Sequence, residues 1–480
     1  MLTRLGILTT LSFLPIVASS ERGALAPCVR PTRAATQVQG EVRICPGRYR
    51  IPDRKEEGVI IAAASGTRLD LTGVVLESGD SVPSRFVGIG VASRGVDAVA
   101  ITGGAIHGYR YGIRLEGGRG HRIAGSDVSG SRNQRVVSTP ARPDSADRLN
   151  LTLPDTFERY GGGILLLHTM AATITGTNAR NAQNGIALMD VRDSYVADND
   201  VSSNDGWGIH LWRASRNVIT RNQADHVRRC ETQVPAGDCN AAAILLRDAS
   251  DSNSIVDNDL TAASLGVLLA GERRVTRPSV GNLVYRNDAS GALKNGFACS
   301  FSWGNSFLEN RADSTSTGVR LDHCGGTTVR ANTVIGARTA AIISDHGTDN
   351  AILANILIGA PLGISVGAPG QPADPSARYR IDDNVLARLQ QGIVLQRTTR
   401  AQLRGNLFDG VGDGLVIDGD GHASEVTGNV FLRASRWFID APDLAAGGNY
   451  WATADAAAAT AKVKGRVSVL PWRPASAAGY

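Results

Sequence analysis

Residues 208–222 read GIHLWRASRNVITRN, with apolar side chains at alternate positions, then a polar turn and a lone asparagine. Alternation with period two is typical of a β-strand whose two faces meet different environments. The face that the apolar side chains leave unused carries His210, Trp212 and Arg213. The rest of the chain explains this arrangement, because the pattern recurs.

The recurrence has two landmarks that share one period. Most steps between successive starts of the pattern are 22 or 23 residues. A small residue followed by alternating apolar residues begins at Gly112, Gly163, Gly185, Gly208, Ala243, Gly266, Gly296, Gly318, Ala341, Gly363, Gly392 and Gly414. An asparagine follows most of these starts at a fixed offset, at Asn178, Asn199, Asn222, Asn258, Asn310, Asn332, Asn355, Asn406 and Asn429, with Asn287 and Asn384 displaced by inserted loops.

A period of this length indicates stacked repeats, either helical solenoids, leucine-rich horseshoes or parallel β-solenoids. Period-two alternation excludes helices, and frequent Gly, Asn, Asp and Thr leave no helix-compatible half for a horseshoe. We therefore predict an all-β fold, a single-stranded right-handed parallel β-helix in which stacked asparagine amides bond to one another. We assign residues 1–26 to a signal peptide, 27–57 to an N-terminal cap, 58–440 to the β-helix and 441–480 to a C-terminal cap and tail.

The N-terminal residues indicate export. Arg4 precedes an apolar run, residues 5–18, that is too short to cross a bilayer and is followed by small residues, as in a secretory signal. No other segment of the sequence is long and apolar enough for a membrane span. We expect cleavage between residues 19 and 26 and a periplasmic or secreted protein.

Composition limits the partners. Aromatic residues make up 5% of the chain and glycine contributes 55 residues, which favours many tight turns over a large aromatic core. The net charge of +5 comes almost wholly from arginine, which suits bidentate recognition of carboxylate, sulfate or phosphate. These charges are interspersed with Asp and Glu, so nucleic acid is not expected as a partner.

Six cysteines lie beyond the predicted signal peptide, and export permits disulfides. Local spacing favours the pairs Cys28 with Cys45 and Cys230 with Cys239. Cys299 and Cys324 pair if their turns are neighbours. A zinc site is the alternative, although no cysteine pair has metal-ligand spacing with nearby histidines.

These repeats, together with the ending GGNYWATADAAAATAKVKGRVSVLPWRP (447–474), resemble the parallel β-helix repeat superfamily of secreted proteins. That superfamily includes polysaccharide lyases, mannuronan C5-epimerases, polygalacturonase-type hydrolases and the periplasmic β-helix protein that loads copper into nitrous oxide reductase. The resemblance covers roughly residues 58 to 472 and implies the pectate-lyase-like solenoid fold. It leaves the activity open, because one fold carries many functions.

The candidate site follows from the predicted register, because equivalent outward positions of coils about 4.8 Å apart form ladders on one wall. For any single residue a solvated surface position is the simpler interpretation, but several on one strip favour a groove. We predict catalytic roles for His210, His323, Arg213, Asp190 and Asp248. We predict substrate binding by Trp212, Arg247, Arg320, Asp322, Asp345, His346 and His168. His323 and His210 are the first candidates for a base, followed by His346 and Tyr160.

The residue types favour an acidic polysaccharide. Arginines can clamp uronate carboxylates, and Trp212 or Trp303 can stack on sugar rings. Lyases and C5-epimerases both remove the C5 proton beside a neutralised carboxylate, so they need a base and a cation together. We predict a polysaccharide lyase-like protein without a firmly assigned cofactor. As an alternative cation, calcium would be held by oxygens of Asp190, Asp248, Asp322 or Asp345.

Other activities stay open. A hydrolase would use paired carboxylates, either Asp190 with Asp248 or Asp322 with Asp345. The segments LDHCGG (321–326) and SDHGTDN (344–350) share Asp and His with the epimerase signature but lack its Asp-Pro-His core, and the paired-Asp and Arg-Ile-Lys motifs of polygalacturonases are missing. A second class is a noncatalytic envelope polysaccharide-binding or accessory protein resembling the copper-loading relative, although the chain lacks a Met or Cys cluster suited to copper. A third class is a purely structural surface protein.

Overall fold

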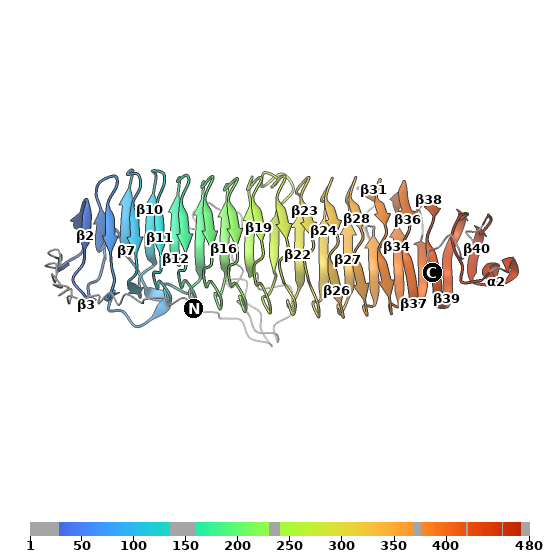
Figure 1. The fold of residues 1–480 in the computed structure, drawn as a ribbon, viewed down its shortest axis with the longest axis horizontal. Coiled ribbons are helices and arrows are strands. Elements are labelled where there is room, and N and C mark those ends of the chain that lie inside the picture. Colours follow the sequence, from blue (N-terminus) through green and yellow to red (C-terminus); the bar gives the residue numbers. More distant parts are fainter. Residues whose placement is uncertain are drawn as a thin grey trace, which may run out of the picture.

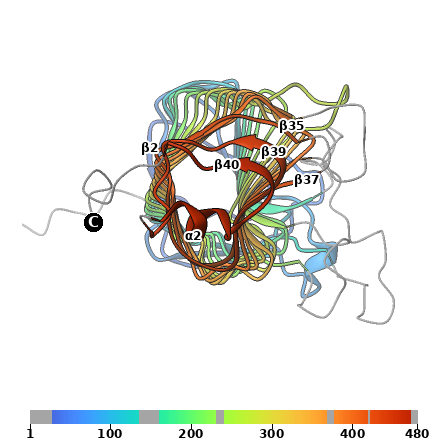
Figure 2. The same cartoon turned by 90° about the vertical axis from the view of Figure 1, so that its right-hand side faces the viewer.

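The computed structural model describes residues 28–134, 160–229, 241–367, 376–418, 421–453 and 455–471. Over these residues the chain winds into a long rod of stacked coils (Figure 1), and the view along the rod shows the coils superimposed (Figure 2). Neighbouring strands pair in parallel and in register, for example β14 with β16 and β16 with β18. The protein is a single-stranded right-handed parallel β-helix, as the repeat predicts.

The strands with the period-two pattern form the longest sheet. Within the described residues its 20 strands are β1 (Thr36–Val38), β4 (Ile60–Ala62), β7 (Ile89–Arg94), β10 (Tyr111–Glu116), β12 (Gly162–Leu167), β14 (Asn184–Met189), β16 (Trp207–Trp212), β18 (Ala242–Arg247), β20 (Val267–Ala270), β22 (Asn295–Ser300), β24 (Thr317–Asp322), β27 (Ala340–Asp345), β30 (Leu362–Val366), β34 (Gln391–Gln396), β37 (Leu407–Asp418), β39 (Val430–Ala445) and β40 (Val463–Ser468), with β26 (Thr333–Ile335), β29 (Ile356–Ile358) and β33 (Val385–Ala387) joined through β37.

A second sheet of short strands forms another wall. Its 15 strands in the described part of the chain are β2 (Glu41–Arg43), β5 (Arg68–Asp70), β8 (Ala100–Thr102), β11 (Arg122–Ala124), β13 (Thr173–Thr175), β15 (Tyr195–Ala197), β17 (Val218–Thr220), β19 (Ser254–Val256), β21 (Leu283–Tyr285), β23 (Ser306–Leu308), β25 (Thr328–Arg330), β28 (Ala351–Leu353), β32 (Arg380–Asp382), β36 (Ala401–Arg404) and β38 (Ala423–Thr427).

The remaining elements are small. They are β3 (Gly47–Arg50), β6 (Val74–Glu77) and β9 (Ala105–His107), the pair β31 (Ser376–Ala377) and β35 (Thr398–Thr399), the 3-10 turn η1 (Pro83–Arg85) and the helix α2 (Ala456–Thr460). The helix lies at the C-terminal end of the rod (Figures 1 and 2). In the described ranges no helix has the length and apolar character that a membrane crossing requires.

Alternation places one set of side chains inside the tube. Ile164, Ile186, Ile209 and Ile244 occupy equivalent positions on β12, β14, β16 and β18, and each has 0% of its surface exposed. A shift of one residue in any strand would move its apolar side chains to the other face, so this core fixes the register.

The asparagine column is a continuous hydrogen-bonded ladder. Each Nδ2 donates to the Oδ1 of the asparagine on the next coil, at distances from 2.9 to 3.1 Å. Its members are Asn199, Asn222, Asn258, Asn287, Asn310, Asn332, Asn355, Asn384, Asn406, Asn429 and Asn449. The prediction for Asn178 was wrong, because Thr177 occupies the ladder position there and its amide donates to Asn199 Oδ1.

A second asparagine ladder, which the repeat pattern did not predict, lies at another corner. Asn217, Asn253, Asn282 and Asn305 bond to one another in the same way, with Nδ2 to Oδ1 distances of 3.0 to 3.1 Å. Each of these residues directly precedes a strand of the second sheet. That position before a short β-branched-rich strand is the signal by which this ladder could have been recognised.

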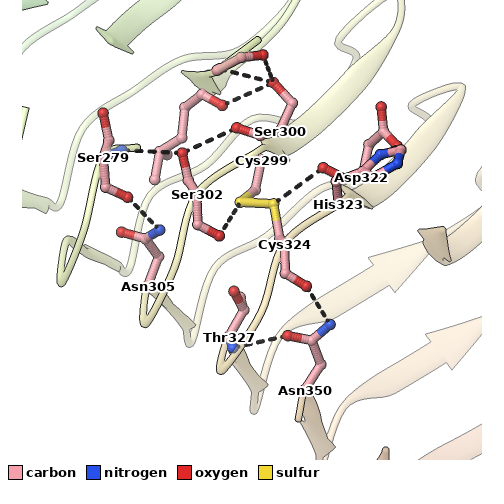
Figure 3. The surroundings of a disulfide bond; sticks show 12 residues. Ser279, Cys299, Ser300, Ser302, Asn305, Asp322, His323, Cys324, Thr327 and Asn350 are labelled. Atoms are coloured by element: carbon pink, nitrogen blue, oxygen red, sulfur yellow. Dashed lines mark hydrogen bonds and ion pairs between the residues drawn. A yellow bond between two sulfur atoms is a disulfide. The ribbon is translucent and has the colours of Figure 1, made fainter. Parts of the chain in front are cut away.

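Two predicted disulfides are present, Cys28–Cys45 and Cys299–Cys324. The second joins Cys299 on β22 to Cys324, two residues after the end of β24, and therefore fastens two adjacent coils (Figure 3). Cys230 and Cys239 lie outside the described residues, as does the predicted signal peptide. The predicted cap, residues 27–57, contributes β1, which already pairs in parallel with β4.

Candidate functional site

The candidate residues at the end of each long strand share one backbone conformation. His168, Asp190, Arg213, Asp248, Phe301, His323 and His346 have φ between 43° and 53°. The chain turns from the long sheet at this left-handed position, where Asp and His are among the better tolerated residue types. We call these residues the corner row. The left-handed turn explains why Asp and His recur at these positions. Their side-chain contacts decide what each residue can do.

The outer face of the long sheet is apolar over the coils that include β12 to β20. Leu165, Ala187 and Leu245 point outward from these strands and are 0 to 1% exposed. They belong to two small clusters outside the main core, together with Tyr111, Tyr160, Leu167, Trp207, Trp212, Ala242, Leu265, Ala270 and Ala298. This part of the face is therefore a second packed layer, and Tyr160 is part of it.

His210 lies in this outer layer. It is 2% exposed, and its ring centroid is 5.9 Å from that of Trp207 and 6.3 Å from that of Trp212. Burial, with a smaller contribution from the neighbouring Arg247 guanidinium, holds the pKa of His210 well below its usual value. His210 is therefore neutral at physiological pH and is remote from solvent.

Asp248 is the centre of a charged group beside this layer. Its carboxylate accepts hydrogen bonds from Trp212 Nε1 at 3.1 Å, Arg213 Nε at 2.6 Å and the Arg277 amide at 3.0 Å. Burial raises the pKa of Asp248, but the hydrogen bonds from Arg277 and Arg213 outweigh it and lower the pKa overall. Asp248 is thus ionised, and its carboxylate links its own coil to the Trp212–Arg213 corner and to the segment that contains Arg277.

Arg247 lies over the Trp212 ring, with Cζ 5.0 Å from the ring centroid. The residue is 1% exposed, and its Nε and Nη1 atoms have no hydrogen-bond partner among the described residues. Burial lowers the pKa of Arg247 to about 10, against the opposing effect of Glu272 and Asp248. The guanidinium therefore stays charged at neutral pH and is stabilised by the cation–π contact and nearby carboxylates.

We expect Asp248→Asn to lower the free energy of unfolding by about 2 kcal/mol at pH 7, because an amide cannot replace the buried, charge-assisted acceptor. The lowered pKa makes the Asp248 contribution present above the unfolded-state value, near 3.8, and lost as pH falls through the folded-state value. The difference between wild type and variant should hold from pH 7 to about pH 4 and narrow below it. Denaturant unfolding measured across this pH range tests the expectation.

A matched control is Asp193→Asn, which removes an exposed carboxylate bound by Arg216 at 2.7 and 2.8 Å. Solvent screens that ion pair, so this variant should change stability much less. An equal loss in both variants would show that Asp248 is an ordinary surface partner.

His168 and Asp190 form a separate exposed pair. His168 Nδ1 lies 3.3 Å from Asp190 Oδ2, and 58% of the His168 side chain is exposed. Like Arg213 with Asp248, the pair joins adjacent coils along the corner row. Asp190 and Asp248, which were predicted as a carboxylate pair, therefore each form an ion pair with a different residue, Asp190 with His168 and Asp248 with Arg213.

Farther toward the C-terminus, five predicted residues come together on adjacent strands β24 and β27 and their corners. We call Arg320, Asp322, His323, Asp345 and His346 the His323 cluster. Asp322 and Asp345 are directly opposite partners in the strand register. Arg320 Nη2 donates to Asp345 Oδ2 at 2.9 Å, and His323 Nδ1 lies 2.8 Å from Asp322 Oδ1.

Aromatic stacking orders the rings of this cluster. The His323 ring stacks on Phe301 from the preceding coil and on His346 from the following coil, with centroid distances of 4.4 Å on both sides. The neighbouring residue Cys324 is disulfide-bonded to Cys299, so the coils of Phe301 and His323 are covalently fastened (Figure 3). The imidazole is therefore held between two rings and a carboxylate.

The carboxyl of Asp345 differs electrostatically from an ordinary surface group. Its side chain is 14% exposed, and burial raises its pKa; Arg320 and both histidines oppose the rise, and Asp322 adds to it. The net shift is upward. The cluster thus combines a cation, a carboxyl group with increased proton affinity and an oriented imidazole within two coils, and the surface is partly open to solvent.

The described residues contain no group of three or more His, Cys, Asp or Glu side chains in a metal-binding arrangement. All eight histidines lie in described segments. The two methionines there, Met170 and Met189, are on separate strips of the surface, and Met170 is 44% exposed.

Several solved structures show a similar chain course. The Dettilon tailspike protein matches with 17% identity and a TM-score of 0.48, covering 68% of this chain and 61% of the tailspike chain. A double mutant of the periplasmic alginate epimerase AlgG matches with 14% identity and a TM-score of 0.46, covering 83% and 85%. The mannuronan C-5 epimerase AlgE4 A-module of Azotobacter vinelandii matches with 16% identity and a TM-score of 0.41, covering 80% and 91%.

A search of curated protein sequences found no significant match. A family profile, by contrast, matches three overlapping segments, residues 97–291, 236–365 and 280–465, which together span most of the β-helix. By this match the chain belongs to the family described as periplasmic copper-binding protein (NosD).

Proposed function

We propose that this protein is exported, binds a uronate-containing polysaccharide across the corner row, and abstracts the C5 proton at the His323 cluster. The observation that carries the proposal is the pairing of two units on adjacent coils, His323 with Asp322 and Arg320 with Asp345. The periplasmic description of the family and the two disulfides support export, because disulfides persist in oxidising compartments.

His323 is suited to act as the base. When Nδ1–H donates its hydrogen bond to the Asp322 carboxylate, Nε2 is the ring nitrogen that carries the lone pair. Stacking between Phe301 and His346 limits rotation of the ring. An imidazole held in one orientation, with a free lone pair on Nε2, is an efficient proton acceptor.

Arg320 is suited to neutralise the sugar carboxylate. One Nη2 hydrogen bond goes to Asp345, and 41% of the Arg320 side chain is exposed. A guanidinium has five N–H donors, so it can bind a second carboxylate while it holds the first. Such a cation stabilises the charge that develops when the C5 proton leaves.

Asp345 is suited to complete an elimination. Nε2 of His323 takes the C5 proton, the electron pair forms the C4–C5 double bond, and the C4–O4 bond breaks. The leaving oxygen then takes a proton from Asp345, because burial raises the pKa of this carboxyl and makes it easier to protonate than an ordinary surface aspartate. If the C4–O4 bond stays intact and C5 regains a proton on the opposite face, the same site performs epimerisation.

Hydrolysis is the second candidate, favoured by one observation. Asp322 and Asp345 face each other on neighbouring strands, about 4.8 Å apart by strand spacing, and the pKa of Asp345 is raised. Retaining glycosidases use two carboxyl groups about 5 to 5.5 Å apart, one of which has a raised pKa and acts as the acid. Side chains at two paired positions of adjacent strands suit that arrangement.

Incubation with a panel of uronate polymers separates these activities. Elimination produces unsaturated ends that absorb in the ultraviolet, epimerisation in heavy water incorporates deuterium at C5, and hydrolysis yields reducing ends without either signal. We expect unsaturated ends. Binding of the polymers without any product would assign a noncatalytic role, and absence of binding to every polymer would contradict the proposal.

Copper, which the family description implies, does not fit the described side chains. The four described cysteines are in disulfides, the two described methionines lie apart, and no three potential ligands converge. Copper sites favour thiolate, thioether and imidazole ligands gathered at one place. No step of the proposed reaction therefore involves copper.

A further inference from the structure

We propose that Trp303 forms a sugar-stacking subsite next to the His323 cluster and binds the pyranose ring adjacent to the reactive sugar. This inference rests on the proposed function and assigns a binding surface that the reaction chemistry does not require. Trp303 follows β22 and is 44% exposed. Trp207, Trp212 and Trp451, by contrast, are 1 to 2% exposed.

The exposed indole packs against the backbone of the next coil at Gly325. Trp303 is paired with Gly325 in a parallel bridge, and the Gly304 amide donates to the Gly325 carbonyl at 2.9 Å. A Cβ atom on Gly325 would lie 2.9 Å from Trp303 Cε3 and 3.1 Å from Cζ3. The absence of a side chain at Gly325 therefore allows the indole to lie against its backbone.

Trp303 and Gly325 both lie close in sequence to residues of the proposed reaction site. Gly325 is two residues after His323, and Trp303 is two residues after Phe301, whose ring stacks on His323 at 4.4 Å. The Cys299–Cys324 bond fastens these same coils just inside the corner. Trp303 is thus placed around the corner from His323 on a rigid frame, as a positioned surface residue rather than as part of a mobile loop.

The chemistry of the surface identifies its ligand. A pyranose ring has an apolar C–H face that packs on an aromatic side chain, whereas its carboxylate requires a cation. Trp303 offers the first contact and Arg320, on the same coil as Gly325, offers the second. A uronate chain that crosses the corner satisfies both at neighbouring positions. Trp212, the other aromatic candidate, is covered by Arg247.

The test compares Trp303→Ala with Trp303→Phe and Gly325→Ala. Affinity for a uronate oligosaccharide is measured by calorimetry with catalytically slowed His323→Gln protein as the common background. We expect about tenfold weaker binding for Trp303→Ala, near wild-type binding for Trp303→Phe, and unchanged thermal unfolding for both. Gly325→Ala should weaken binding similarly, because its Cβ displaces the indole.

The double variant Trp303→Ala/Gly325→Ala should be no weaker than Trp303→Ala, since the glycine acts only through the indole. Tyr195→Ala is the matched control, because Tyr195 is 36% exposed on β15, away from the cluster. If the background protein binds the oligosaccharide and Trp303→Ala binds it equally well, this inference is overturned and the proposed function stands. If the background protein binds no uronate, the result contradicts both this inference and the proposed function.

Discussion

His323→Ala is expected to lower the rate of product formation from a uronate polymer by about 10²- to 10⁴-fold, the usual contribution of a general base. The variant removes the imidazole that Asp322 orients and that Phe301 and His346 hold between their rings. The measurement is the initial rate of unsaturated-end formation across pH 5 to 9. It should show the loss of rate, and the limb of the pH–rate profile that is due to the base should disappear.

The chain offers a close control for this change. His226 also has a left-handed backbone, with φ of 54°, and its Nδ1 lies 2.6 Å from the carboxylate of the preceding residue, Asp225. It is not in the corner row, so His226→Ala should retain full activity. Comparable rates for His323→Ala and wild type would place the base elsewhere and remove the cluster from the reaction.

Asp322→Asn separates the orienting role from the catalytic one. The amide can occupy the same position near His323 Nδ1 but does not stabilise the imidazolium. We expect a smaller loss of rate than for His323→Ala, because the amide does not stabilise the imidazolium that forms when the ring takes the C5 proton. A rate equal to that of the wild type would mean that Asp322 only packs at the corner.

The largest expected effect on stability is that of Asn310→Ala, a loss of about 3 to 5 kcal/mol. Asn310 Oδ1 accepts bonds from the amide and the Nδ2 of Asn287, and its Nδ2 donates to the Val284 carbonyl and to Asn332 Oδ1. Removal of the side chain leaves several buried groups without partners, and water does not reach them because Asn310 is 1% exposed. Chemical unfolding followed by circular dichroism measures the change.

Asn178→Ala is the control for the ladder. Asn178 lies one residue beyond the ladder position and is partly buried, so loss of its side chain breaks no chain of amides. We expect a change within about 0.5 kcal/mol, as for most substitutions away from buried networks. A small effect of Asn310→Ala would mean that the stacked backbone alone carries the stability of the middle coils.

Much of the architecture could be predicted from local pattern because each coil repeats the same physical problem. Alternation assigns Ile186 and Ile209 to the interior, and a shared period predicts that their coils stack. The same register predicts that Asp322 and Asp345 are neighbours, as the structure shows. The second asparagine ladder was not predicted, because its members, such as Asn253, precede short strands with little alternation.

The sequence by itself determined the β-helix, its inward apolar column, most of the asparagine ladder and the strip on which the polar candidates lie, because these follow from period and strand alternation. Only the tertiary structure decided which outward side chains reach solvent and which carboxylate each cation selects. His210 and His323 both follow the outward pattern, yet one is 2% exposed in an apolar layer and the other is held by Asp322 beside a partly open surface. Alternation states only that a side chain leaves the core. Whether it then meets water, an aromatic ring or a counter-charge depends on residues from other coils, and their side-chain positions are set by packing in three dimensions.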